Sequence, residues 1–156
     1  MSTPHHRLIP LMLAALLASA TLPVQAADAK VSAGRTALAA PATKHRIVIQ
    51  INEQDVKKWN GVLANIRNIQ TELGPKNVAV AVVAIGDGLG MLTAESLTAN
   101  GVEDALAAGV EFVACGNSMK AQHIAKDDLV TGVSVSIAGY VELMKRQQQG
   151  WAYLRP

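Results

Sequence analysis

The chain of 156 residues contains a single cysteine, Cys115. One thiol cannot close an internal disulfide, so in an oxidising compartment it must be buried and inert, paired with another chain, or kept as a working thiol. Aromatic side chains make up only 3% of the sequence, and the formal net charge is +2. Because lysine and arginine are scattered and form no basic stripe, a nucleic-acid-binding surface is not expected.

The sequence also lacks an apolar run long enough to cross a membrane. Residues 8–22 are mostly apolar and are interrupted by one proline, and their length of about 15 residues falls short of the roughly 20 that a spanning helix needs. Basic residues precede this run, and small residues follow it up to Ala26. We therefore predict that residues 1–26 form a signal peptide, that the mature protein is periplasmic or otherwise exported, and that no stable membrane anchor remains after cleavage.

The rest of the chain divides into a short lead-in and one domain. Residues 27–43 are rich in alanine, with serine, glycine and threonine, and show no sustained period. This composition predicts a flexible lead-in. Residues 44–156 are one domain's worth of chain and are apolar enough to close a single core.

Within the domain, short apolar runs alternate with segments that have helical spacing. The expected strands lie at residues 46–51, 78–85, 110–115, 133–137 and 151–154. The expected helices lie at residues 56–73, 100–107, 118–125 and 137–149. This alternation is typical of βαβ units. It predicts an α/β fold, a compact five-stranded and mostly parallel sheet with helices on both faces.

Several polar and glycine residues predict where the helices begin and end. Asn52 or Asp55 can cap the first helix, and Gly74 can end it. Asn100 with Glu103 three residues later resembles a capping box for the second helix. These residues separate the strands from the helices that follow them.

Cys115 stands where an apolar strand runs into residues that start a helix. In an open α/β sheet this rim is where ligands and reacting groups gather. The partial positive charge of a helix start favours a thiolate, so we predict Cys115 as the catalytic nucleophile. The alternative is a buried structural cysteine, because a free thiol packs like a small hydrophobe. No histidine lies close by in sequence to serve as its base.

A glycine-rich loop, residues 86–90, follows the second expected strand. It lacks the glycine spacing and the Lys-Ser/Thr pair of phosphate-binding loops, so we do not expect a nucleotide there. We expect it to form a ligand-binding rim beside Cys115. The predicted rim residues are Gly86, Asp87, Gly88, Gly116, Asn117 and Ser118.

Cys115, Met119 and His123 are spaced by four residues. On one continuous helix they would share a face, and thiolate, thioether and imidazole together suit a soft metal such as copper(I). The simpler interpretation is that Met119 fills the core and His123 is an ordinary surface residue. We therefore assign no metal site and expect no cofactor.

Two motifs give the chain a family resemblance. Phe-Val-Ala-Cys-Gly-Asn-Ser-Met at residues 112–119 and Gln-Gly-Trp-Ala-Tyr at residues 149–153 resemble segments of the DsrE/DsrF-like family, and the similarity covers residues 44–156. The resemblance implies a small α/β protein that assembles into homo-oligomers, commonly trimers or hexamers. It further implies sulfur relay, in which a cysteine, here Cys115, carries a persulfide between partners.

These observations give three functional hypotheses. The first is an exported DsrE-like protein in which Cys115 carries sulfane sulfur between a donor and an acceptor, each a protein or a small thiol. Such a protein would be at most a sulfurtransferase-type carrier. The alternatives are a non-catalytic small-ligand-binding or assembly module and a soft-metal-binding protein.

Overall fold

The computed structural model describes residues 45–156, and the predicted signal peptide and lead-in lie outside these residues. The strands are β1 (His45–Ile51), β2 (Val78–Ala84), β3 (Glu111–Cys115), β4 (Ser134–Ser136) and β5 (Ala152–Leu154). The α-helices are α1 (Val56–Leu73), α2 (Ala99–Ala107), α3 (Gly116–Gln122) and α4 (Gly139–Gln148), with short 3₁₀ helices η1 (Gly86–Leu92) and η2 (Lys126–Asp128).

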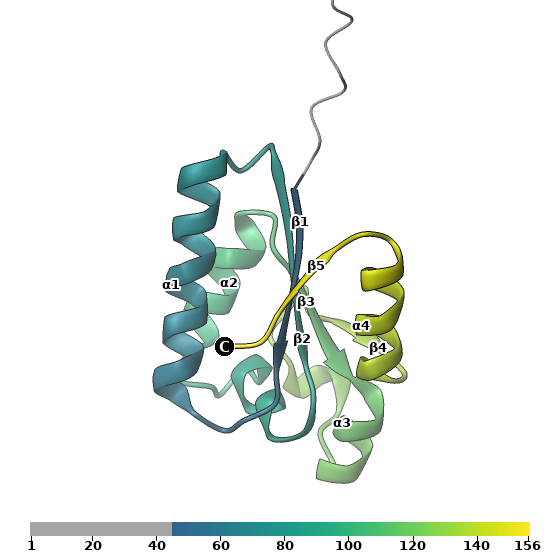
Figure 1. Ribbon diagram of the computed structural model, residues 1–156. Helices are drawn as coiled ribbons and strands as arrows, with labels where there is room; N and C mark the ends of the chain where they lie inside the picture. The colour runs from purple at the N-terminus through teal and green to yellow at the C-terminus, as the bar shows by residue number, and fades with distance from the viewer. Residues whose placement is uncertain (1–44) are drawn as a thin grey trace, which may run out of the picture. The chain divides into compact units, whose positions relative to one another are not determined.

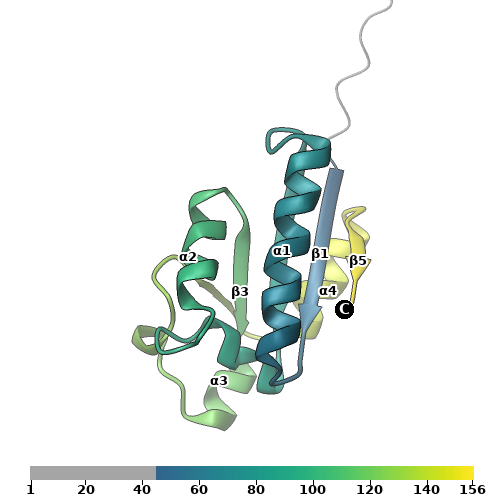
Figure 2. The same cartoon turned by 90° about the vertical axis from the view of Figure 1, so that its left-hand side faces the viewer.

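The five strands form one sheet in the order β4-β3-β2-β1-β5, and every neighbouring pair is parallel. Figures 1 and 2 show α1 and α2 on one face of the sheet and α4 on the other. This arrangement confirms the predicted α/β sheet with helices on both faces. Because all strands run the same way, their carboxyl ends meet at one edge, where ligands commonly bind in such sheets.

The first helix begins and ends close to where the sequence predicts. The side chain of Asp55 accepts a hydrogen bond from the backbone N–H of Lys58 at 3.0 Å, so Asp55 rather than Asn52 caps α1. Gly74 follows the helix with φ of 82°, a conformation that glycine adopts without steric cost.

The core on the α1 and α2 face is extensive. Apolar side chains of β1, β2 and β3 meet a row of buried side chains on α1, and buried residues of η1 and α2 complete the cluster. The α1 row consists of Trp59, Val62, Leu63 and Ile66. Its spacing of three and four residues places these side chains on one face of the helix.

The core on the α4 face is much smaller. Its buried residues are Val48, Ala81, Val83, Ile85, Val113, Cys115 and Leu143, with Trp151 packed against them. One polar side chain is also buried on this side: Gln50 is 4% exposed and accepts a hydrogen bond from the hydroxyl of Tyr153 at 2.6 Å. That bond satisfies an amide oxygen that would otherwise be costly to bury.

The starts of α2, α3 and α4 differ from the sequence prediction. The second helix begins at Ala99 and follows Thr98, which makes no side-chain capping bond, so the capping box predicted for Asn100 and Glu103 is wrong. Helix α3 begins at Gly116 directly after the strand and ends at Gln122, whereas the sequence predicts residues 118–125. His123 ends it in the left-handed conformation with φ of 57°.

The last helix begins at Gly139 rather than at residue 137. Residues 137 and 138 instead belong to the connection between β4 and α4. Within residues 45–156, no helix has both the length and the apolar character required to cross a bilayer.

Candidate functional site

Cys115 lies where the sequence predicts, at the carboxyl end of β3. It is the last residue of the strand and also the N-cap of α3, with φ of −77° and ψ of 113°. Its side chain is not open to solvent, because the residue is only 4% exposed. The thiol therefore lies inside the small core on the α4 face.

The surroundings of the sulfur favour its ionised form despite this burial. Burial raises the pKa of the Cys115 thiol, but the hydroxyl of Ser118 and the backbone N–H groups of Gly139, Ser118 and Asn117 lower it, and the net shift is downward. The N–H of Gly139 donates to Sγ at 3.2 Å. Hydrogen bonds to the charged form stabilise a thiolate, whereas a cysteine in purely apolar surroundings has a raised pKa.

Residues 137 and 138 connect β4 to α4, and together with the flanking Ser136 and Gly139 they form what we call the β4–α4 loop, which lies against the thiol. Besides the bond from Gly139 to the sulfur, the backbone N–H of Asn117 donates to the carbonyl of Ile137 at 3.0 Å. A Cβ atom added at Gly139 would lie 2.7 Å from Cγ1 of Ile85 and 3.1 Å from Cβ of Cys115. Since real Cβ atoms do not approach other atoms to 2.7 Å, only glycine fits this position without a shift of its neighbours.

Several of the predicted rim residues come together beside Cys115. The backbone N–H of Gly86 donates to Oγ of Ser118 at 2.9 Å, which joins the loop after β2 to the first turn of α3. Gly116 and Asn117 belong to that same turn.

Asp87 and Gly88 differ from each other in their surroundings. Asp87 is exposed, while Gly88 is buried against the end of β1. A Cβ at Gly88 would collide with the backbone carbonyl of Ile51. Gly88 therefore has a packing reason to be glycine.

The three residues of the soft-metal hypothesis do not form one set. Cys115 precedes α3 and belongs to the core on the α4 face, whereas Met119 belongs to the core on the α1 face. His123 follows the end of the helix and is exposed. Among the described residues, no three histidine, cysteine or carboxylate side chains are grouped so that they could hold a metal ion.

Helix α4 carries an apolar stripe on its outer surface. Four large exposed apolar residues, one in the loop before α4 and three on the helix, follow helical spacing. Such a stripe ordinarily faces a core. The four residues are Ile137 at 84%, Tyr140 at 65%, Val141 at 42% and Met144 at 47% exposure. The residues that α4 buries are Gly139 and Leu143.

Gly139 is the site residue that sequence reasoning missed. It lies 24 residues from Cys115 in the chain, and the periodicity of Ile137, Tyr140 and Met144 places it inside the predicted helix. The signal that could have found it is the parallel pairing of β3 with β4, in which Cys115 pairs with Ser136. That pairing brings the start of the next helix beside the thiol.

Four cavities of about 250 to 400 Å³ lie on the described surface. None of the four is lined by Cys115 or by the predicted rim residues. The most apolar one lies between α1 and the carboxyl end of the chain, lined by Ile49, Val62, Asn65, Ile69, Leu154, Arg155 and Pro156.

Comparisons with known proteins give the same fold. MTH1491, a protein of unknown function from Methanobacterium thermoautotrophicum, is 35% identical, with a TM-score of 0.69 over 72% of this chain and 99% of its own. The ychN protein from E. coli is 17% identical, with a TM-score of 0.62 over 72% of this chain and 99% of its own. BT1422 from Bacteroides thetaiotaomicron, a conserved protein of unknown function, is 15% identical, with a TM-score of 0.61 over 75% of this chain and 99% of its own.

No curated protein matches the chain. The family comparison is more specific, because the model of the DsrE/DsrF-like family matches residues 23–156. This match covers the whole sheet and the residues around Cys115. The chain therefore belongs to the DsrE/DsrF-like family.

Proposed function

We propose that this protein is an exported sulfur carrier in which Cys115 accepts sulfane sulfur and passes it on. The observation that carries the proposal is the hydrogen bond from the N–H of Gly139 to Sγ at 3.2 Å, which favours the thiolate of a cysteine that is only 4% exposed. A cysteine that merely filled space would gain nothing from backbone N–H groups directed at its sulfur. Membership of the DsrE/DsrF-like family supports the sulfur chemistry, and the predicted signal peptide supports export.

The proposed reaction is a pair of balanced thiol exchanges. The Cys115 thiolate attacks the outer sulfur of a donor persulfide, R–S–SH, which forms Cys115–S–SH and releases R–S⁻. An acceptor thiolate then attacks the outer sulfur of Cys115–S–SH, which transfers that sulfur and restores the Cys115 thiolate. No second cysteine, metal or cofactor takes part.

Intact mass spectrometry of the mature protein after a brief polysulfide treatment tests this proposal. We expect the mass to rise by one sulfur atom and to return to its starting value after treatment with dithiothreitol or cyanide. Cys115→Ser should show no such gain. An equal gain in Cys115→Ser, or no gain in the wild-type protein, would refute sulfur carriage on this residue.

We also propose that the chain assembles into homo-oligomers, trimers or hexamers, through Tyr140, Val141 and Met144, the part of the apolar stripe that lies within α4 itself. Large apolar side chains exposed together mark interaction surfaces more often than single ones do. Tyr140→Ser combined with Met144→Ser should reduce the mass measured by chromatography with light scattering to that of one chain. Leu97→Ser is the matched control, because Leu97 is 86% exposed and lies outside the stripe. The same mass for the double variant and the wild-type protein would exclude the stripe as the interface.

The second candidate function is a non-catalytic binding or assembly module, and the burial of Cys115 favours it. A thiol that is 4% exposed can be a packing residue, in which case alkylating reagents would modify it only after unfolding. This outcome would refute the sulfur-carrier proposal. The candidate binding surfaces would then be the exposed apolar stripe of α4 and the predicted rim formed by residues 86–88 and 116–118.

A further inference from the structure

The sulfur of Cys115 accepts a hydrogen bond that favours its thiolate, but it is buried. The two ends of the helix beside it are held by different numbers of contacts. The β4–α4 loop lies against the sulfur and continues into α4. Cys115 is only 4% exposed, and the N–H of Gly139 in this loop lies 3.2 Å from Sγ, so the loop is part of what separates the sulfur from solvent. How strongly each end of α4 is held therefore decides how the thiol becomes accessible.

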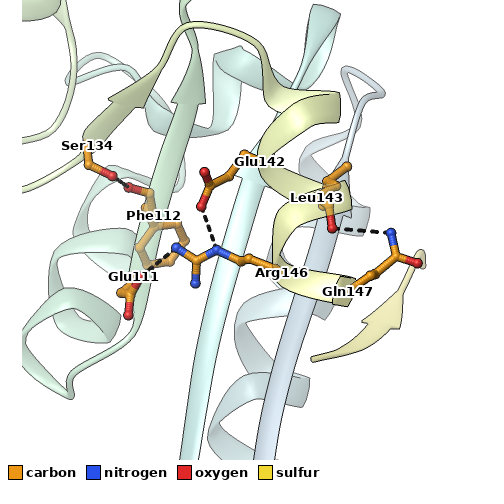
Figure 3. A network of polar contacts seen from close by, with 7 residues as sticks. All are labelled: Glu111, Phe112, Ser134, Glu142, Leu143, Arg146 and Gln147. Atoms are coloured by element: carbon orange, nitrogen blue, oxygen red, sulfur yellow. Dashed lines mark hydrogen bonds and ion pairs between the residues drawn. The ribbon is translucent and has the colours of Figure 1, made fainter. Parts of the chain in front are cut away.

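The far end of α4 is firmly anchored. Arg146 donates to Glu142, one turn earlier on the same helix, and to Glu111 at the start of β3, each at 2.7 Å. Only the pair with Glu111 joins α4 to the sheet; the Arg146 side chain is 11% exposed and that of Glu111 is 56% exposed. Figure 3 shows the guanidinium of Arg146 between these two carboxylates. The same guanidinium lies 4.6 Å from the centre of the Trp151 ring. The neighbouring side chain of Leu143 is buried at 3% exposure.

The near end of α4 is held much more weakly. Ala138, its N-cap residue, makes no side-chain capping bond. The loop is attached at Gly139 to the sulfur and at Ile137 to the N–H of Asn117. Strand β4, which leads into it, pairs with β3, and the hydroxyl of Ser134 donates to the carbonyl of Phe112 at 3.0 Å. It is nevertheless an edge strand of three residues with no fully buried side chain. Ile137, the largest residue of the loop, is 84% exposed and so contributes little buried apolar surface.

We propose that the β4–α4 loop is a lid that opens locally over Cys115 while α4 stays attached at Arg146. Closed, the lid shields the sulfur and supplies the N–H of Gly139 that stabilises the thiolate; open, it exposes the sulfur to a reagent. Segments with few buried contacts open at a free energy well below that of global unfolding. The biological role of the lid rests on the proposed function, because access to the sulfur matters only if Cys115 reacts.

Alkylation of the folded protein with iodoacetamide measures this opening. Local opening predicts a rate on the order of ten- to a hundredfold below that of the urea-unfolded chain. Access only through global unfolding predicts protection of more than about a thousandfold. Rates at low urea separate the two further, because local opening exposes little surface and hardly depends on urea. A rate that tracks global unfolding followed by circular dichroism would overturn the lid, and so would a rate equal to that of the unfolded chain.

A substitution inside the lid makes the test specific. Gly139→Ala forces a Cβ against Ile85 and Cys115, which disfavours closure, and we expect alkylation about tenfold faster. Gly61→Ala on α1 is the matched control, because its Cβ would meet no atom within 4 Å, and its rate should equal that of the wild-type protein. The combined Gly139→Ala and Ile85→Ala variant removes the clashing side chain and should return the rate toward that of the wild-type protein.

Two further readouts separate the lid from its alternatives. An unchanged rate in Gly139→Ala, or equal acceleration in Gly61→Ala, would overturn the lid. A wild-type rate that falls as protein concentration rises would do so too, since a neighbouring subunit would then be the shield. If alkylation follows the lid pattern while polysulfide leaves no adduct on Cys115, the lid stands and the sulfur-carrier proposal fails.

Discussion

The two faces of the sheet are built for different purposes. On the α1 and α2 face, a broad layer of apolar side chains seals three strands. On the α4 face, one helix contributes Leu143 as its only large buried side chain, and the thiol of Cys115 lies beside it. We therefore expect the α1 and α2 face to contribute more to the free energy of unfolding than the α4 face, on which Cys115 lies.

The α4 face also contains buried polar side chains. Gln50 and Cys115 are both 4% exposed there. The amide oxygen of Gln50 accepts from the hydroxyl of Tyr153, and the sulfur of Cys115 accepts from the N–H of Gly139. Buried polar groups are costly when they lose a partner. A small movement of a segment on this face would therefore change the hydrogen bonds to Gln50 and Cys115 as well as the packing.

A matched pair of leucines tests this contrast most strongly. Leu63 on α1 and Leu143 on α4 are each 3% exposed, so burial alone predicts the same cost on truncation. We expect Leu63→Ala to lower the free energy of unfolding by about 4 kcal/mol and Leu143→Ala by about 2–3 kcal/mol, because a site beside a thin layer collapses more easily. Urea unfolding of both variants measures the difference. Equal costs would show that the α4 face is as firmly packed as the other.

The Arg146 anchor is expected to have a smaller effect on stability. Burial lowers the pKa of Arg146, but its bonds to Glu111 and Glu142 outweigh this effect and raise the pKa, so the group stays charged. Arg146→Gln should lower the free energy of unfolding by about 1–2 kcal/mol and speed alkylation of Cys115, since both ends of α4 would then be loose.

The control for Arg146 is Arg155→Gln. Arg155 pairs with Glu53 at 3.2 Å, but its side chain is 51% exposed, and screened surface pairs contribute little. The urea midpoint of Arg155→Gln should therefore match that of the wild-type protein. A loss of stability as large as that of Arg146→Gln would mean that burial of the ion pair does not matter here.

The smallest effect concerns pH. Because the pKa of folded Cys115 is lowered, the folded protein releases this proton at a lower pH than the unfolded chain does. The thiol's contribution to stability should therefore be fully present above its unfolded pKa. It should decrease as pH falls from the unfolded pKa to the folded pKa, and be lost below the folded pKa. Urea unfolding across this range should show this decrease in the wild-type protein and a flatter profile in Cys115→Ser.

The pH dependence of iodoacetamide alkylation gives a second measurement of the same shift. Its midpoint in the folded protein should lie below that in urea. A midpoint at or above the unfolded value would mean that burial outweighs the hydrogen bonds to the sulfur.

The fold could be predicted from sequence because its signals are local. The apolar run of β2 is buried on both faces, the α1 stripe matches the thick core, and Cys115 ends its strand as expected. These features depend on residue spacing within one element. The chemical state of the site depends on an approach between Gly139 and Cys115, which are far apart in the chain, and no local pattern encodes it.

The apolar stripe of α4 shows a second limit. Tyr140, Val141 and Met144 predict the helix correctly but not the direction that their side chains face. Periodicity identifies a stripe without saying whether a core or a partner covers it. Whether the stripe is buried depends on the rest of the fold and on assembly, and the sequence of the helix alone predicts neither.

The parallel sheet gives the molecule a defined polarity. Strand β1 starts at His45 at the top of Figure 1, while α3, which follows Cys115, lies at the bottom. The seven residues of β1 rise by roughly 3.3 Å each, so about 20 Å of sheet separates the two. A tag, a fusion partner or a solid support attached before His45 would therefore leave the thiol end of the protein facing solution.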